Sequence, residues 1–106
     1  MKKLVYVASP YSNNPQKNYE DVLRYVKKYF LEEGIILFSP IIYCHNIKLS
    51  ANHLGIEYYK DFVLMMLSKS DELWVLMLDG WENSEGVKQE IEFAKQNGIK
   101  IRYIEE

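Results

Sequence analysis

The chain has 106 residues, which is enough for one domain and too few for two, so we treat residues 1–106 as a single domain. Hydrophobic residues make up 48% of the chain, so a real core can form, and the net charge is only -2. No cluster of Lys and Arg creates a basic surface, and we therefore expect no polymeric nucleic acid as a partner.

The N-terminal apolar run is too short for a signal peptide, and the polar residues Ser12, Asn13 and Asn14 follow it closely. No run approaches the length of a membrane-spanning helix, so we expect no membrane partner. Cys44 is the single cysteine. It argues against a disulfide framework and favours the cytoplasm, a reducing compartment, where we expect it to be a packed thiol.

The first half of the chain alternates strand and helix signals. Residues 4–8 form an apolar run of strand length, and a polar loop with two prolines follows over 9–15. A helix over about 16–33 is predicted by a stripe with i, i+3, i+4 spacing, which contains Val22, Tyr25, Val26, Tyr29 and Phe30. The run 35–39 predicts a second strand that Pro40 stops. Residues 40–55 indicate either a functional loop or a short irregular helix, because they are long for a connection.

The second half repeats this alternation. A helix is predicted over about 56–68, and a third strand begins after Asp71. A polar loop with Gly80 and Gly86 leads into a helix that Asn97 and Gly98 close, and residues 99–104 form the last strand.

Strands that alternate with helices indicate a parallel sheet with helices on both faces, because such crossovers are right-handed. We therefore predict an α/β fold, a three-layer Rossmann-like or flavodoxin-like sheet with strand order about 2-1-3-4. Ligands of such sheets bind where the strand order reverses, at the carboxyl ends of strands 1 and 3. That point would gather the loop Ser9–Ser12, the loop Asp79–Ser84 and the start of the last helix.

Glu90 breaks the pattern of the last helix. Val87, Ile91 and Ala94 fall on one apolar stripe, and Glu90 lies near the middle of that face. A carboxylate turned inward there is desolvated at a cost or lines a pocket, and the other interpretation is a helix-edge Glu whose stem bends out to water. Periodicity alone leaves both interpretations open.

The loop before this helix is a candidate anion site. Asn83 or Ser84 can cap the helix, and Gly86 would let a ligand approach the backbone, although an ordinary N-cap explains the same residues. No Walker lysine is present and no GxGxxG follows the first strand, so we expect no ATP or NAD cofactor.

Other polar residues give weaker signals. His45 and His53 are too widely spaced for a metal pair without a third ligand, so we expect no metal, and His45 is retained as a pocket-lining residue. Asp61 lies at the edge of an apolar helix face, where an exposed side chain is the simpler interpretation. Asp79 is better placed for a ligand, because it follows the third strand.

Three segments, in order, resemble a known family. They are VYVASPY at 5–11, DFVLMMLSKSD at 61–71 and SEGVKQEIEFAKQNG at 84–98. The chain resembles the nucleoside 2-deoxyribosyltransferase superfamily, and within it the small members that include 2'-deoxynucleoside 5'-monophosphate N-glycosidases. The resemblance covers nearly the whole chain.

The resemblance implies a role for each candidate. Glu90 would be the nucleophile that attacks the anomeric carbon of the deoxyribosyl group, Tyr6 would hold its carboxylate, and Asp61 would protonate or orient the leaving base. The substrate-binding positions would be Ser9, Pro10, Tyr11, Ser12, His45, Asp79, Ser84 and Gly86. The expected partner is a small-molecule nucleoside or nucleotide.

The same residues also fit other functions. The larger transferases carry a C-terminal extension that this sequence lacks, which weakens the transferase interpretation more than the hydrolase one. A non-catalytic nucleotide-sensing module and an interaction domain using Tyr58 and Trp81 are the other hypotheses. A homodimer or higher homo-oligomer is expected, because family members assemble and many aromatic residues need cover.

Overall fold

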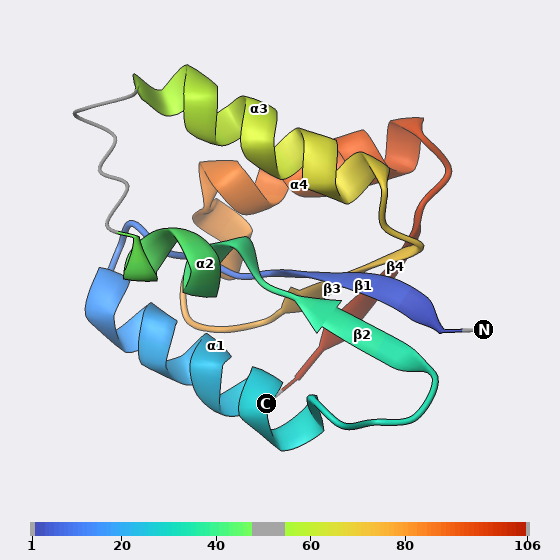
Figure 1. The fold of residues 1–106 in the computed structure, drawn as a ribbon. Helices are drawn as coiled ribbons and strands as arrows, with labels where there is room; N and C mark the ends of the chain where they lie inside the picture. The colour runs from blue at the N-terminus through green and yellow to red at the C-terminus, as the bar shows by residue number, and fades with distance from the viewer. Residues whose placement is uncertain (1, 48–54, 106) are drawn as a thin grey trace.

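The structure, a computed structural model, describes residues 2–47 and 55–105, with the backbone alone for 55–59. Its sheet has four parallel strands: β1 (Lys3–Ala8), β2 (Ile35–Phe38), β3 (Glu72–Leu76) and β4 (Lys100–Ile104) (Figure 1). Their order is β2-β1-β3-β4, which confirms the predicted strand order. The order therefore reverses between β1 and β3.

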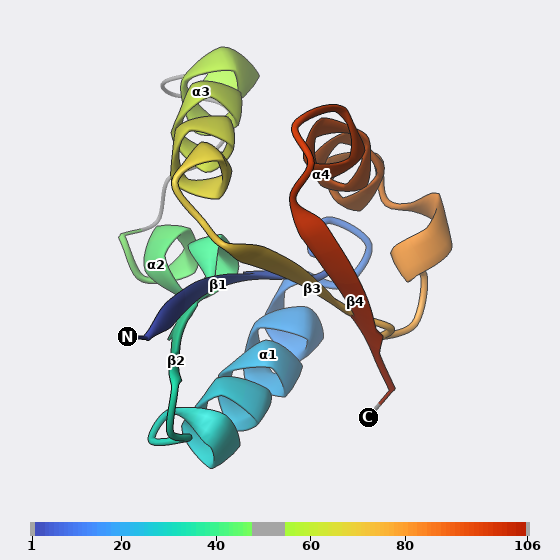
Figure 2. The ribbon, with the colours of Figure 1, turned by 90° about the vertical axis from the view of Figure 1, so that its right-hand side faces the viewer.

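Helices cover both faces of the sheet. The helix α1 (Pro15–Tyr29) lies on one face, and α3 (Gly55–Ser68) and α4 (Glu85–Gln96) lie on the other (Figure 2). The short helix α2 (Pro40–Asn46) follows β2, and a single 3-10 turn, η1 (Trp81–Asn83), precedes α4. This arrangement is the predicted three-layer α/β fold.

The central strand β1 is buried on both sides, which explains its uninterrupted apolar sequence. Val5 and Val7 pack with the α1 core, whereas Tyr6 and Ala8 pack with the α3 and α4 core. Side chains of a strand alternate between faces, so Tyr6 is directed toward the helix that carries Glu90.

The first predicted helix differs from the structure at its end, whereas the stretch after Pro40 begins with a short helix, one of its two predicted possibilities. The first helix ends at Tyr29 rather than near Glu33, and Phe30, which was placed on its buried stripe, is 58% exposed. Leu31 is 89% exposed, so the core no longer holds the helix beyond Tyr29. The ambiguous stretch after Pro40 begins with α2, whose N-cap Ser39 accepts a hydrogen bond from the Ile42 backbone N–H at 3.2 Å, and its remainder lies outside the described residues.

None of the described helices is both long enough and apolar enough to cross a membrane.

Candidate functional site

A carboxylate and a phenol meet beneath α4. The buried residues of this helix are Val87, Glu90 and Ala94, which share one face at helical spacing. Glu90 is 7% exposed and Tyr6 is fully buried, and the Tyr6 hydroxyl donates a hydrogen bond to Glu90 Oε2. Of the two interpretations that periodicity left open, the structure has the inward-turned side chain.

Burial changes the acidity of Glu90. Loss of hydration disfavours the charged form and raises the pKa from 4.5 to about 7, while the hydrogen bond from Tyr6 opposes that shift. Near neutral pH the group therefore exists as both acid and carboxylate. Such a carboxyl group can act as a nucleophile, base or acid, and groups of this kind concentrate at functional sites.

The start of α4 follows β3 through a loop and the turn η1. Ser84 is its N-cap, and its Oγ accepts a hydrogen bond from the Val87 backbone N–H at 3.3 Å. Gly86 is exposed, and a Cβ there would meet only Ser84 Oγ, at 3.9 Å, so packing within the chain does not require glycine. A helix start with an open backbone is suited to an anionic group.

The loop after β1 begins with buried residues. Ser9 and Pro10 are buried, Tyr11 is half-buried and Ser12 is exposed. Ser9 Oγ has no hydrogen-bond partner among the described residues. The loop therefore places one desolvated hydroxyl at the carboxyl end of the central strand.

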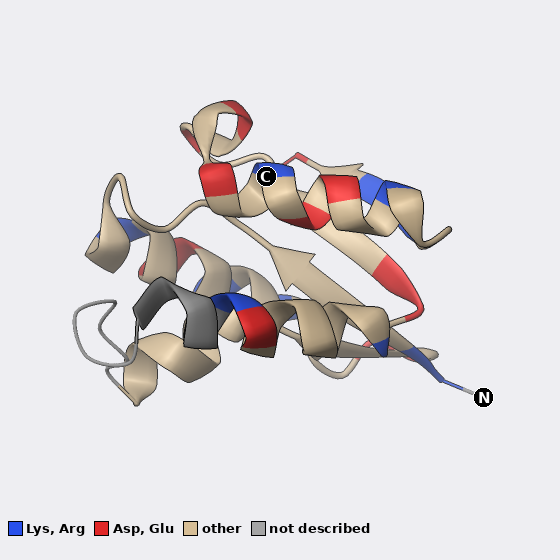
Figure 3. Ribbon diagram, turned by 90° about the horizontal axis from the view of Figure 1, so that it is seen from above, with Lys and Arg blue, Asp and Glu red and all other residues tan. Residues whose placement is uncertain are grey.

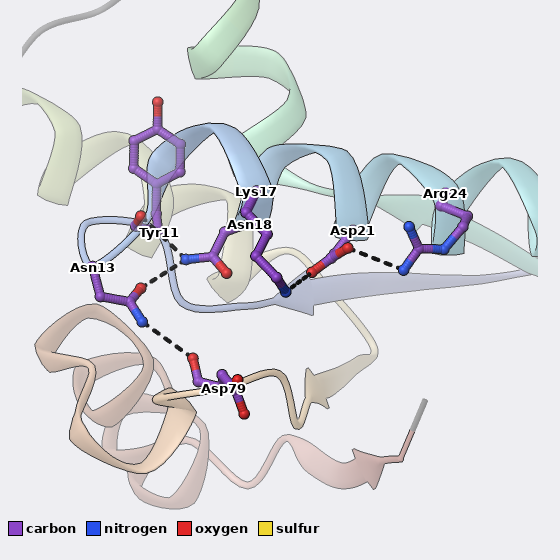
Figure 4. A network of polar contacts seen from close by, with 7 residues as sticks. All are labelled: Tyr11, Asn13, Lys17, Asn18, Asp21, Arg24 and Asp79. Atoms are coloured by element: carbon purple, nitrogen blue, oxygen red, sulfur yellow. Dashed lines mark hydrogen bonds and ion pairs between the residues drawn. The ribbon is translucent and has the colours of Figure 1, made fainter.

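Two asparagines that the sequence analysis did not single out join this loop to its neighbours (Figure 4). Asn18 of α1 donates from Nδ2 to the Tyr11 carbonyl at 3.2 Å and to Asn13 Oδ1 at 2.7 Å. Asn13 Nδ2 then donates to the Asp79 carbonyl at 3.2 Å. The sequence did contain a signal for Asn18, because this polar residue lies on the same helical stripe as Val22. Glu90 is a similar polar residue on the apolar stripe of α4.

His45 also contacts the loop. Its Nδ1 lies 2.8 Å from the Tyr11 hydroxyl, and its ring stacks on Tyr19 with centroids 3.9 Å apart. The pKa of Tyr11 is raised, chiefly by burial and secondarily by the nearby Cys44. Tyr19 is a further residue that the sequence analysis missed.

Asp61 and Asp79, the acidic candidates other than Glu90, are exposed. Asp61 has an exposed side chain on α3, and the Asp79 side chain is also exposed, although its carbonyl accepts the bond from Asn13. Within the described ranges, no group of three or more His, Cys, Asp or Glu residues could hold a metal ion. His53 falls in the segment that is not described.

One surface groove lies away from these residues. Lys2 and residues 30–37 line it, near the amino ends of β1 and β2, whereas the loops that carry Ser9–Ser12 and Asp79 follow the carboxyl ends of β1 and β3. Neither Tyr6 nor Glu90 is among the residues that line this groove.

A family model described as a domain of unknown function (DUF7768) matches residues 3–104. The chain belongs to this family. This DUF7768 domain is also similar to a solved structure, the 2-deoxyribosyltransferase from the psychrotolerant bacterium Bacillus psychrosaccharolyticus, with a TM-score of 0.61 and 18% identity. The match covers 96% of this chain and 72% of the other, and it supports the fold that the resemblance implied. No curated protein sequence matches the DUF7768 chain.

Proposed function

We propose that this domain cleaves the N-glycosidic bond of 2'-deoxynucleosides or their 5'-monophosphates, by hydrolysis or by transfer of the deoxyribosyl group to another base. The observation that carries the proposal is the buried Glu90 carboxyl group, which accepts a hydrogen bond from Tyr6. Tyr6 lies on β1, which borders the point where the strand order reverses, and ligands of this fold class bind at the carboxyl ends of the strands there. The fold similarity to a 2-deoxyribosyltransferase supports the same reaction class.

In the proposed reaction, a Glu90 carboxylate oxygen bonds to the anomeric carbon as the bond from that carbon to the base nitrogen breaks. The base leaves with a proton supplied by Asp61 or by water. Water, or a second base, then attacks the same carbon from the side that the first base left, and the ester to Glu90 breaks. Two displacements give overall retention, and the enzyme is regenerated.

The substrate would lie across the carboxyl ends of β1 and β3. Ser84 and Gly86 at the start of α4, together with Ser9 and Ser12, would hold the 5' end, as a phosphate when the substrate is a nucleotide. The remaining contacts would come from Pro10, Tyr11, His45 and Asp79. The open backbone at Gly86 supports this placement.

The test is to incubate the protein with a panel of 2'-deoxynucleosides and their 5'-monophosphates and to measure free base by chromatography. The E90Q variant should release no base. The matched control is E92Q, because Glu92 lies on the same helix with an exposed side chain, and it should keep wild-type turnover. Unchanged turnover in E90Q would eliminate this mechanism.

The exposed side chain of Asp61 favours one alternative, a non-catalytic nucleotide-sensing module with the same fold. A leaving base with no acid held beside it departs more slowly. This alternative predicts that isothermal titration detects binding of a nucleoside or monophosphate while prolonged incubation releases no base.

We also propose that the chain forms a homodimer or a higher homo-oligomer. Residues 62–67 of α3 are all apolar, and no charge is coloured on that part of the helix in Figure 3, unlike on α4. Met65 on this helix is 60% exposed, and Tyr43 and Ile47 are 52% and 51% exposed. Contiguous exposed apolar residues often mark a protein–protein interface. Light scattering after size exclusion should show a multimer that M65E weakens, and a monomer at high concentration would contradict the proposal.

A further inference from the structure

Asn18 is a buried amide whose two N–H bonds are both used. Its side chain is 2% exposed, and its Nδ2 donates to the Tyr11 carbonyl and to Asn13 Oδ1. The first bond tightens a turn, because the same carbonyl also accepts the Asn14 backbone N–H at 3.2 Å. The second bond orients the Asn13 amide, leaving its Nδ2 to donate elsewhere.

Asn13 Nδ2 donates its hydrogen bond to the loop after β3. Asn13 Nδ2 contacts the Asp79 carbonyl, at a turn closed by the Trp81 backbone N–H and the Leu78 carbonyl at 3.0 Å. Gly80 occupies the left-handed region there with φ 86°. A Cβ on Gly80 would lie 2.7 Å from Asn13 Nδ2, so the two turns are in close contact.

We propose that Asn18 is a positioning residue that locks the loops after β1 and β3 into one unit and thereby sets the substrate-binding geometry. The connection between the two loops rests on these contacts alone, whereas its effect on substrate binding rests on the proposed function. The two loops carry most of the candidate binding residues, including Tyr11, Ser12 and Asp79. The proposed catalytic pair, Tyr6 and Glu90, lies on β1 and α4, and none of the bonds made by Asn18 and Asn13 involves either residue.

The chemistry of the position requires an uncharged donor. An aspartate at 18 would place an acceptor oxygen against the Tyr11 carbonyl and the Asn13 amide oxygen, and neither contact could then be a hydrogen bond. The nearby ion pairs, Lys17 with Asp21 at 2.8 Å and Asp21 with Arg24 at 3.0 Å, join residues within α1 and involve exposed cations, so they contribute little. The buried amide is therefore the part that holds the loops.

Hydrogen exchange tests the connection without any substrate. In N18D, amide exchange should increase by about tenfold or more in both 9–14 and 78–84, because both loops lose their common support, while β1 and β3 stay protected. The control is N14D, the same chemical change at an exposed residue that makes no side-chain cap bond. If N18D fails to fold, N13A gives the test, and it should loosen 78–84 more than residues 9–11.

Exchange confined to 9–14 in N18D, or equal loosening of the whole chain, would overturn the proposal. So would an N13A variant whose 78–84 segment exchanges like the wild type.

Kinetics test the effect on substrate, using base release from whichever panel member the wild type turns over. N18D should raise KM by about tenfold with kcat within about twofold of wild type, because binding is lost while the catalytic pair is intact. A merely structural defect would reduce the active fraction, lowering kcat at unchanged KM, and that result would overturn the positioning role. A wild type that releases no base removes the proposed reaction but leaves the exchange result to decide the connection.

Discussion

The hydroxyl of Tyr6 donates a hydrogen bond to the carboxylate of Glu90, 84 residues farther along the chain. The contact exists because side chains alternate across β1 and because α4 presents Glu90 on its buried face. Either polar group alone at this depth would cost stability, and each satisfies the other.

The first prediction concerns the pH dependence of the proposed reaction. Burial raises the pKa of Glu90 to about 7, and the carboxylate is the reactive form of a nucleophile. We therefore expect kcat/KM for base release to rise with pH up to about 7 and then level off. Steady-state assays from pH 5 to 9 measure this profile, and a decrease through the same interval would instead assign Glu90 the role of an acid.

The second prediction concerns the Tyr6 hydroxyl. Its hydrogen bond lowers the pKa of Glu90 against the larger effect of burial, so Y6F should move the rising limb of the profile to higher pH. The ring remains to fill the core, and the fold should persist. Y29F is the control, because Tyr29 packs on the opposite face of the sheet, and its profile should match the wild type. A Y6F limb at the wild-type position would contradict the assigned contact.

The third prediction concerns stability. The folded-state pKa of Glu90 lies above 4.5, so between pH 4.5 and about 7 the unfolded chain releases a proton that the folded chain retains. The free energy of unfolding contributed by this group is complete below pH 4.5 and is lost as pH rises to about 7. Glutamine does not titrate, so the stability of E90Q relative to wild type should increase over this interval by on the order of 3 kcal/mol.

Urea unfolding at pH 4.5 and 8 measures that difference, with E92Q as the control whose stability should track the wild type. An E90Q advantage that is the same at both pH values would show that Glu90 does not titrate in this range.

The sequence predicted the fold well because the signals were local and repeated. The apolar run of β1 and the stripes of α1 and α4 are properties of short segments, and the alternation of strands with helices then indicates a parallel sheet covered on both faces. The end of α1 was wrong for a physical reason: Phe30 continues the helical spacing, but the sheet no longer lies beneath it and the side chain is exposed. The spacing of apolar residues along a helix does not show where the sheet that covers the helix ends.

The candidate site was only partly predictable for a related reason. Glu90 was visible as a charge on an apolar stripe, but the choice between inward and outward needed the position of Tyr6 on a distant strand. The bonds of Asn18 and Asn13, and the stack of His45 on Tyr19, depend on how loops approach one another. Such contacts leave little periodic trace in the sequence.

The last prediction separates backbone strain from loop contact by a matched pair of glycines. Gly34 and Gly80 both have positive φ, 85° and 86°, so alanine should cost each about 1 kcal/mol through the left-handed backbone. A Cβ at Gly34 would meet nothing within 4 Å, whereas one at Gly80 would lie 2.7 Å from Asn13 Nδ2 and displace that amide from Asp79. G80A should therefore be less stable than G34A in urea unfolding, and hydrogen exchange should loosen residues 9–14 and 78–84 in G80A alone. Equal stability and equal exchange in the two variants would mean that the turns tolerate separation, and the connection through Asn13 would then have no mechanical role.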